Sequence, residues 1–182
     1  MNLLLSSHNI RTAAGHKYVD LGLSVNWALC NVGARQYNDC GDYFAIDKME
    51  GHYGINIKRS AGNTVDWGMG WRIPTKQEFE ELLTSCYMIW IKNDQTWGWA
   101  VIKRGCPGQF LFLPAGGYRD LEGNICSQQR ACYWTSSDYQ YDPKFAWAYE
   151  MEGQYKLCVS NDLHYGFLIR PVLMREYEHL YI

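Results

Sequence analysis

The strongest local signal in the sequence is a helix start at Thr75. Thr75 followed three residues later by Glu78 forms a capping box. The Thr hydroxyl accepts a hydrogen bond from the Glu78 amide, and the Glu carboxylate accepts one from the Thr75 amide. Apolar side chains at Phe79, Leu82 and Leu83 then recur at helical spacing. A helix is therefore predicted to begin here and to press one apolar face against a core.

Most of the remaining chain reads as short strands separated by turns. Apolar runs at 99–103 and 109–114 end at turns built from Gly or Pro. Asn93 and Asp94 lie between two apolar runs and predict a hairpin turn. One clear helix, over about residues 75–86, among many strands predicts the α+β class with small twisted antiparallel sheets.

The charge pattern argues against nucleic acid and membrane insertion. The chain has 17 basic and 19 acidic residues, for a net charge of −2, and no block of like charge. No apolar run is long enough to span a membrane. Aromatic residues are abundant instead, at 15% with 14 Tyr and 8 Trp. A chain of this size would struggle to bury all of these rings, and exposed Tyr and Trp are favoured anchors in binding surfaces.

The cysteines do not follow a metal-binding pattern. There are seven, an odd number, and no two are spaced as Cys-x-x-Cys, so a zinc site is poorly supported. Mostly free thiols are expected rather than a disulfide framework. Cys126 and Cys132 are close enough in sequence to be bridged across a loop.

Eight short segments together resemble a known family. They include HKYVDLGLS, WRIPT, FLPAGGYR, YWTSS and GFLIRPV, and they lie at residues 16–24, 27–28, 30–34, 41–45, 71–75, 112–119, 133–137 and 166–172. In the same order they resemble motifs of the bacterial major-paralogous-domain family (FISUMP). Any one segment is a weak signal, whereas eight in order over residues 16–172 are a strong one.

The resemblance implies a C-type-lectin-like fold. It places a domain at 16–172 between an N-terminal arm, 1–15, and a C-terminal tail, 173–182. It implies that a strand near 18–27 pairs with one near 167–172, and that 71–74 packs under a small central sheet. The same fold is used by the variable proteins of diversity-generating retroelements, in which chosen codons of the C-terminal part are rewritten, and by formylglycine-generating enzymes.

Ligand-binding residues are expected on the C-terminal loops. Loops at 138–142 and 161–164 combine aromatic and polar side chains, which suits a binding surface carried by a rigid sheet. The candidates are Asp138, Tyr139, Tyr141, Trp147, Tyr149, Asn161, Asp162 and His164. Trp147 and Tyr149 share a strand face with Met151, so a place in the core is an equally good interpretation for these two.

These features favour a non-catalytic module for adhesion or receptor recognition, without cofactor or metal. Its expected ligand is a protein or glycan on another cell, and a retroelement-diversified variable protein is the narrower hypothesis. The resemblance implies a cell surface or phage particle as its location. Residues 1–7 are too short and lack the basic flank of a signal peptide. Oligomers could form through the termini, by way of residues 3–5 and the tail.

A formylglycine-generating-like copper oxidase is the first alternative. Cys126 and Cys132 are the only cysteines close enough in sequence to form its copper-binding pair, and the motifs that should surround such a pair are missing. A nucleophilic thiol needs a base within reach. His164 and His52 are available for that role, but nothing in the sequence places them near a cysteine.

A calcium-dependent glycan binder is the second alternative. Calcium prefers several oxygen ligands, and the oxygen-bearing side chains of Asp138, Asp142, Asn161 and Asp162 could approach one another. The sugar-specificity tripeptides Glu-Pro-Asn and Gln-Pro-Asp are absent, as is Trp-Asn-Asp. Capping of turns is the commoner use of such Asp and Asn residues.

Overall fold

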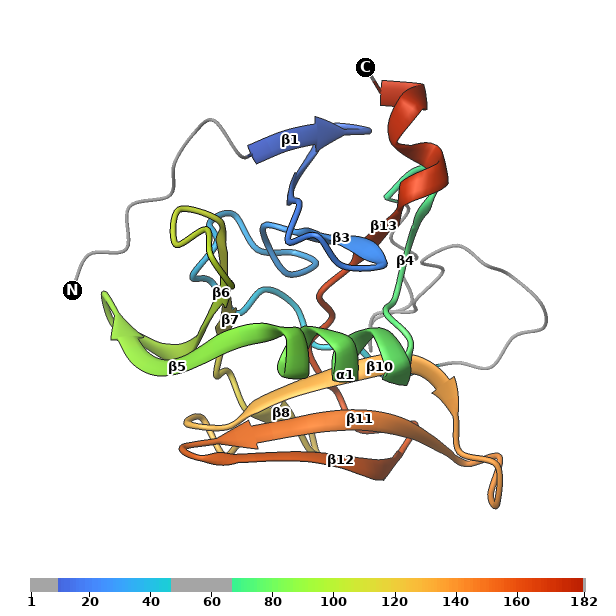
Figure 1. The fold of residues 1–182 in the computed structure, drawn as a ribbon. Helices are drawn as coiled ribbons and strands as arrows, with labels where there is room; N and C mark the ends of the chain where they lie inside the picture. Colours follow the sequence, from blue (N-terminus) through green and yellow to red (C-terminus); the bar gives the residue numbers. More distant parts are fainter. Residues whose placement is uncertain (1–9, 47–66, 182) are drawn as a thin grey trace.

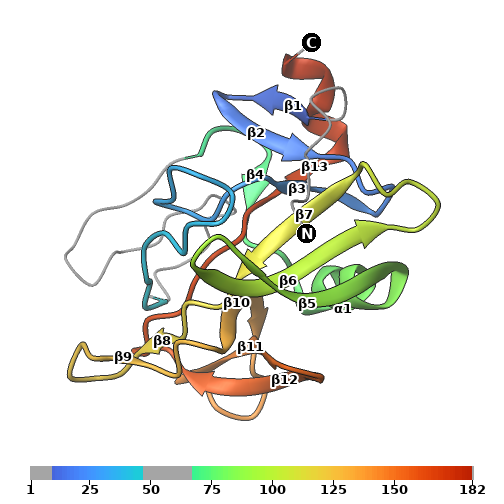
Figure 2. The same ribbon diagram turned by 90° about the vertical axis from the view of Figure 1, so that its left-hand side faces the viewer.

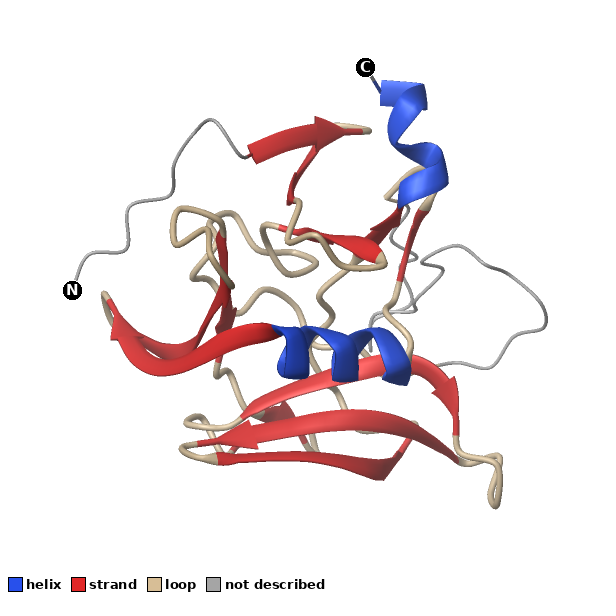
Figure 3. Ribbon diagram, viewed as in Figure 1, coloured by secondary structure: helices blue, strands red, loops and turns tan. Residues whose placement is uncertain are grey.

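Short antiparallel strands predominate in the computed structural model, which describes residues 10–46 and 67–181 (Figures 1 and 3). In chain order the elements are β1 (Ile10–Ala13), β2 (His16–Val19), β3 (Val25–Ala28), β4 (Trp71–Arg72), α1 (Lys76–Ser85), β5 (Cys86–Asn93), β6 (Thr96–Lys103), β7 (Phe110–Pro114), β8 (Tyr118–Arg119), β9 (Ile125–Cys126), β10 (Ala131–Asp138), β11 (Phe145–Glu152), β12 (Tyr155–Asp162), β13 (Val172–Met174) and the 3-10 helix η2 (Arg175–Tyr181). The predicted α+β class is confirmed. No helix in the described part of the chain is long and apolar enough to cross a membrane.

One sheet joins the two ends of the described chain. Its strand order is β1-β2-β3-β13-β4, and Val172 of β13 lies opposite Trp27 of β3. The predicted pairing of N- and C-terminal strands is therefore present. Part of the expected arm also belongs to this sheet, because Ile10–Ala13 pair with β2. Residues 3–5, expected to mediate assembly, lie outside the described residues.

The predicted helix and its capping box are confirmed. The Glu78 amide donates to Thr75 Oγ1 at 3.2 Å, and the Thr75 amide donates to Glu78 Oε2 at 2.8 Å. Arg72 also holds both carboxylate oxygens of Glu78. Phe79 and Leu82 are completely buried, so the apolar helix face packs on the core as its spacing predicted.

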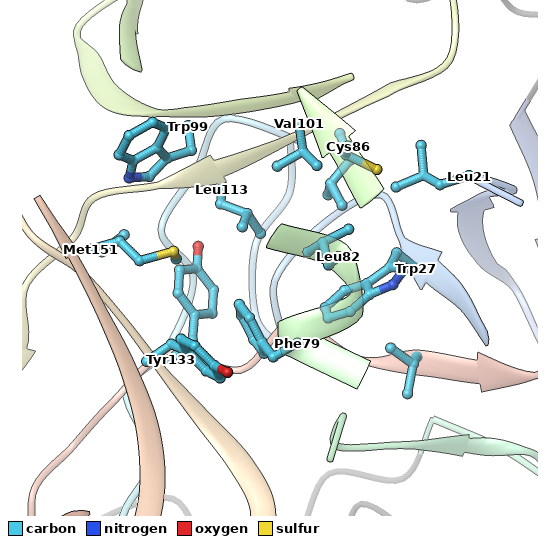
Figure 4. Close-up of a cluster of buried hydrophobic side chains, with 14 of the residues drawn as sticks. Leu21, Trp27, Phe79, Leu82, Cys86, Trp99, Val101, Leu113, Tyr133 and Met151 are labelled. Carbon is cyan, nitrogen blue, oxygen red and sulfur yellow. The ribbon is translucent and has the colours of Figure 1, made fainter. Parts of the chain in front are cut away.

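The main core lies around this helix face. Trp27 of β3 meets the Phe79 ring edge-on at 5.2 Å, and Tyr149 of β11 stacks on it at 4.8 Å. Figure 4 shows Phe79 and Leu82 between Trp27 and Tyr133 in this cluster. The helix thus links the terminal sheet to the β10-β11-β12 sheet.

A second core lies behind the terminal sheet and corrects the expected place of the WRIPT segment. Trp71 is in β4, an edge strand of the five-stranded sheet, rather than underneath a sheet. Its ring meets Tyr18 at 6.3 Å and Trp67 at 5.3 Å, and its Nε1 donates to the Ala13 carbonyl. Trp71 therefore anchors β1 and β2 to β4, whereas Phe79 and Leu82 anchor the helix.

A buried arginine joins the terminal sheet to β7. Arg170 is fully buried, and its guanidinium donates to the carbonyls of Leu29 at 2.5 Å and Phe112 at 2.7 Å. It also donates to Asn31 Oδ1 and the Ala28 carbonyl. Burial lowers the pKa of this guanidinium, and the four oxygens that accept its hydrogen bonds are all neutral. The side chain fixes how β7 meets the loop after β3.

The sheets are arranged in layers. The five-stranded sheet lies at one end of the molecule and the β10-β11-β12 sheet at the other, with α1 and the β5-β6-β7 sheet between them (Figure 2). The β5–β6 hairpin turns at Asp94, whose φ of 52° is left-handed, as the Asn93-Asp94 pattern predicted. The loops of the β10-β11-β12 sheet and the tip of the β5–β6 hairpin lie at the surface of this arrangement (Figure 2).

Candidate functional site

Aromatic side chains from one hairpin form a cluster at the surface. Tyr139 lies at 5.1 Å from Trp147 and at 5.4 Å from Tyr141, measured between ring centroids. The Phe145 ring lies 6.3 Å from Tyr139, and Lys76 Nζ sits 3.7 Å above the Trp147 ring. We call these five residues the aromatic corner. It unites three predicted site residues with two that were not predicted.

The aromatic corner is braced by the start of α1. The Lys76 amide donates to Ser137 Oγ at 3.0 Å, and the Ser136 amide donates to the Pro74 carbonyl at 2.8 Å. Thr135 Oγ1 donates to the Trp147 carbonyl at 2.7 Å. A register shift between Trp134 and Asp138 bends β10 at this point. These bonds hold the end of the hairpin against the capped helix terminus.

Of the two corner residues that were not predicted, Phe145 could have been found from the sequence and Lys76 could not. Phe145 is two residues before Trp147, so strand alternation places both on one face. Lys76 follows the N-cap Thr75, but only the tertiary fold brings it over a tryptophan on another element. The capping box therefore also positions the backbone of Lys76, from which the side chain extends to the Trp147 ring.

Tyr149 belongs to the core, which corrects its prediction as a ligand-binding residue. Its side chain is 5% exposed, and its ring stacks on Phe79. Burial, followed by the nearby Cys158 and Glu80, raises the pKa of its hydroxyl well above the ordinary value of 10.0. The alternation that placed Tyr149 with Met151 was correct: both side chains are buried, and Phe79 of α1 covers Tyr149.

Asn161, Asp162 and His164 do not join the aromatic corner as a group. Asn161 lies opposite Ala146 and donates to Glu150 Oε1 at 3.2 Å, so it is on the other sheet face from Trp147. Asp162 is the cross-strand neighbour of Phe145. Its Oδ1 accepts from the His164 amide at 2.9 Å and meets His164 Nδ1 at 2.7 Å.

The acidic candidates are engaged in turns. Hydrogen bonds from the backbone and then the ring of His164 lower the pKa of Asp162. Asp142 Oδ1 accepts from the Lys144 amide at 2.9 Å, closing the β10–β11 turn. Asp138 ends β10, opposite Ala146. Within the described residues, no group of three or more His, Cys, Asp or Glu side chains could hold a metal ion.

The cysteines are free thiols, as predicted, and no disulfide joins Cys126 to Cys132. Cys132 is buried, and this burial strongly raises the pKa of its thiol. The pKa of Cys126 is also raised, and its Sγ lies 3.6 Å from Asp120 Oδ2. Raised pKa values disfavour the thiolate that copper binding or nucleophilic attack requires. Of the two histidines considered as bases, His164 is bonded to Asp162 and His52 lies outside the described residues.

Comparison with known proteins gives no family assignment. Any function assigned to the chain therefore rests on the geometry of its own residues. No family model, no curated protein and no solved structure matches this chain.

Proposed function

We propose that the chain is a non-catalytic binding module that contacts a protein partner through the aromatic corner. The observation that carries the proposal is the Tyr139–Tyr141–Trp147 cluster, in which Tyr141 remains 76% exposed. The loop between β10 and β11 projects beyond its sheet (Figure 1). A projecting aromatic loop is suited to enter a groove of a partner.

The chemistry of the aromatic corner favours a protein ligand. Tyr and Trp provide large contact areas at low cost in side-chain entropy, and they are enriched among residues that dominate binding energies. The hydrogen bonds to α1 hold the corner in place before binding, which reduces the entropy lost on association. Lys76 adds a positive charge and partly covers the Trp147 ring, so an acidic group on the partner fits best.

The wider assignment is a C-type-lectin-like module related to the FISUMP family. Its support is the pairing of β3 with β13, the small antiparallel sheets and the capped helix α1. The narrower proposal is a retroelement-diversified variable protein at a cell surface or on a phage particle. A near-identical DNA copy of the segment for residues 133–172, differing only at adenines and next to a reverse-transcriptase gene, is expected. Absence of such a copy rejects diversification and leaves the binding module.

The binding function is tested by selecting peptides from a random displayed library on the folded chain. The affinity of a selected peptide is then measured for wild type and for Tyr141→Ala with Trp147→Ala. We expect a loss of about 30-fold or more, as for truncation of aromatic hot spots. Tyr155→Ala is the matched control, because Tyr155 is 62% exposed on β12 and lies outside the corner. Selected peptides that bind the double variant as tightly as wild type reject the proposal.

A further inference from the structure

A cavity of about 480 Å³ lies at the tip of the β5–β6 hairpin. Its walls come from this tip, from the chain leaving β7 at Ala115 and Gly116, and from the turn between β9 and β10. The volume falls within the range of about 300–1,000 Å³ typical of small-molecule sites. The hairpin tip and the β10–β11 loop lie at opposite ends of the molecule in Figure 1, so this cavity, the hairpin pocket, is separate from the aromatic corner.

The hairpin wall of the pocket is held by hydrogen bonds to the loop that contains Tyr37 and Asn38. Asn38 Nδ2 donates to Asp94 Oδ2 at 3.0 Å, and Asn93 Nδ2 donates to the Tyr37 hydroxyl at 3.0 Å. Close to the tip of the hairpin, the Ala115 amide donates to the Trp97 carbonyl at 2.7 Å. The wall that carries Trp97 is therefore set before any ligand arrives.

The opposite wall is fixed by backbone bonds. The Gly117 amide donates to the Arg130 carbonyl at 2.7 Å, and the Arg130 amide donates to the Ser127 carbonyl at 2.8 Å. Gly117 has a φ of 70°, and a Cβ there would lie 1.9 Å from the Cys126 carbonyl oxygen. The turn between these bonds presents Gln128 and Gln129 to the pocket.

The functional groups of the pocket are one indole face and several amides. Trp97 is 36% exposed, and its ring is held parallel to Trp90 at 5.8 Å. Gln95, Gln128 and Gln129 also line the cavity. Each amide offers two donors and an acceptor. The only charged side chain in the described lining is Lys92, which lies opposite Trp97 across the hairpin.

The two lining groups that could ionise to a nucleophile or a base, the Cys40 thiol and the Tyr43 hydroxyl, have raised pKa values. Burial, then the nearby Asp39, raises the pKa of the Cys40 thiol in its lining. Burial also raises the pKa of Tyr43 to about 12, and its hydroxyl donates to the Gly116 carbonyl at 2.5 Å. Both groups stay protonated near neutral pH, so neither supplies a nucleophile or a base.

We propose that the hairpin pocket binds a sugar ring of a glycan without a metal ion. A hexose has an apolar face of C–H groups, which matches the flat exposed Trp97 ring. Its hydroxyls both donate and accept hydrogen bonds, as do the three Gln amides around the pocket. Lys92 and the absence of acidic groups from the described lining select neutral or acidic sugars over amino sugars bearing a positive charge.

A glycan array of neutral and uronic-acid oligosaccharides, probed with the full chain in EDTA, tests this site. We expect a glycan to bind wild type, and both Trp97→Ala and the Gln128→Ala, Gln129→Ala double variant to lose at least about tenfold in affinity. Circular dichroism and thermal melting confirm that each variant is folded. The absence of any bound glycan with folded wild type, or equal binding by folded Trp97→Ala, overturns the proposal.

A cross-check separates this site from the aromatic corner. Trp147→Ala should leave glycan binding unchanged, and Trp97→Ala should leave binding of the selected peptide unchanged. Failure of glycan binding with intact peptide binding rejects only the sugar site. A glycan lost on Trp147→Ala and retained on Trp97→Ala places the sugar at the aromatic corner and rejects the hairpin pocket.

Discussion

The aromatic corner and the hairpin pocket each contain a partly exposed tryptophan, next to a projecting loop in the first and in a cavity in the second. At the corner, Tyr139 and Trp147 pack on each other on a projecting loop, and Lys76 covers part of the indole. In the pocket, Trp97 lines a cavity together with three amide side chains. Surface tryptophan alone therefore says little about the ligand, whereas the shape and polarity around it separate a protein-binding loop from a sugar-binding pocket.

The polar groups differ as well. At the corner, Asp142 and Asp162 are used to close turns. In the pocket, the side chains of Gln95, Gln128 and Gln129 make no hydrogen bond to any other described residue. Amides without a partner among the described residues are available to a ligand, so direct hydrogen bonding should contribute more in the pocket, and ring contact more at the corner.

The largest effect is expected from a substitution in the scaffold, away from both sites. Trp71 is 1% exposed and packs against Tyr18 and Trp67. Trp71→Ala should lower the free energy of unfolding by about 3–5 kcal/mol, because it removes a large buried ring. Urea titration measures the loss, and binding at both sites should fall only in proportion to the unfolded fraction. A folded Trp71→Ala chain that lost one ligand selectively would contradict the division between scaffold and sites.

A smaller loss of stability is expected from replacing Arg170, which joins the terminal sheet to β7 near the pocket. Arg170→Met removes the hydrogen bonds to the carbonyls of Ala28, Leu29 and Phe112 and leaves these oxygens buried. A buried unsatisfied group costs about 1–3 kcal/mol. At the low end of this range for each of the three oxygens, a total of about 3 kcal/mol is expected in urea unfolding.

Arg104→Met is the control for Arg170→Met. Arg104 also donates to carbonyls, those of Ser85 and Thr84, but at an exposed position. This variant should change stability by less than about 0.5 kcal/mol. Equal losses of stability in the two variants would show that burial of the Arg170 guanidinium adds nothing to its contribution to stability.

Local chemistry made the scaffold predictable from the sequence. The capping box of Thr75 and Glu78, the turn at Asn93-Asp94 and the alternation along residues 145–151 each depend on neighbours in sequence. Such patterns act through local hydrogen bonds and side-chain direction, so they survive folding unchanged.

The sites were less predictable because they depend on contacts distant in sequence. Tyr149 and Trp147 lie on one strand face, yet α1 buries the first and leaves the second partly exposed. The hairpin pocket joins Trp97 to Gln128 and Gln129, which no periodicity relates. Arg170 shows the same limit, since a fully buried arginine runs against composition rules and is explained only by the carbonyls around it.

Acid should loosen the corner before the pocket. Burial opposes ionisation of Glu78, but hydrogen bonds from Arg72 and Thr75 outweigh it, so its pKa lies below the ordinary value of 4.5. A lowered pKa means that this stabilisation is present above about pH 4.5 and is lost as the pH falls through the folded-state pKa. About 1 kcal/mol of helix-cap stability should disappear there.

Hydrogen exchange of α1 amides across this pH range measures the acid effect. Protection in the first turn of α1, which carries Lys76, should fall while protection in β6, which carries Trp97, persists. Glu78→Gln should remove the pH dependence in α1. Simultaneous loss of protection in both elements would mean that the two sites share one opening unit.

The smallest expected effect tests the boundary of the corner itself. Tyr149→Phe keeps the ring stacked on Phe79 and removes only the hydroxyl, whose bond to the Lys76 carbonyl is long at 3.4 Å. One hydrogen bond usually contributes about 0.5–1.5 kcal/mol. Because this one is long, the free energy of unfolding in urea should fall by no more than the lower end of that range. Affinity for the selected peptide should be unchanged, since a buried ring does not touch the partner. A clear loss of peptide affinity without loss of stability would return Tyr149 to the binding site and extend the corner under α1.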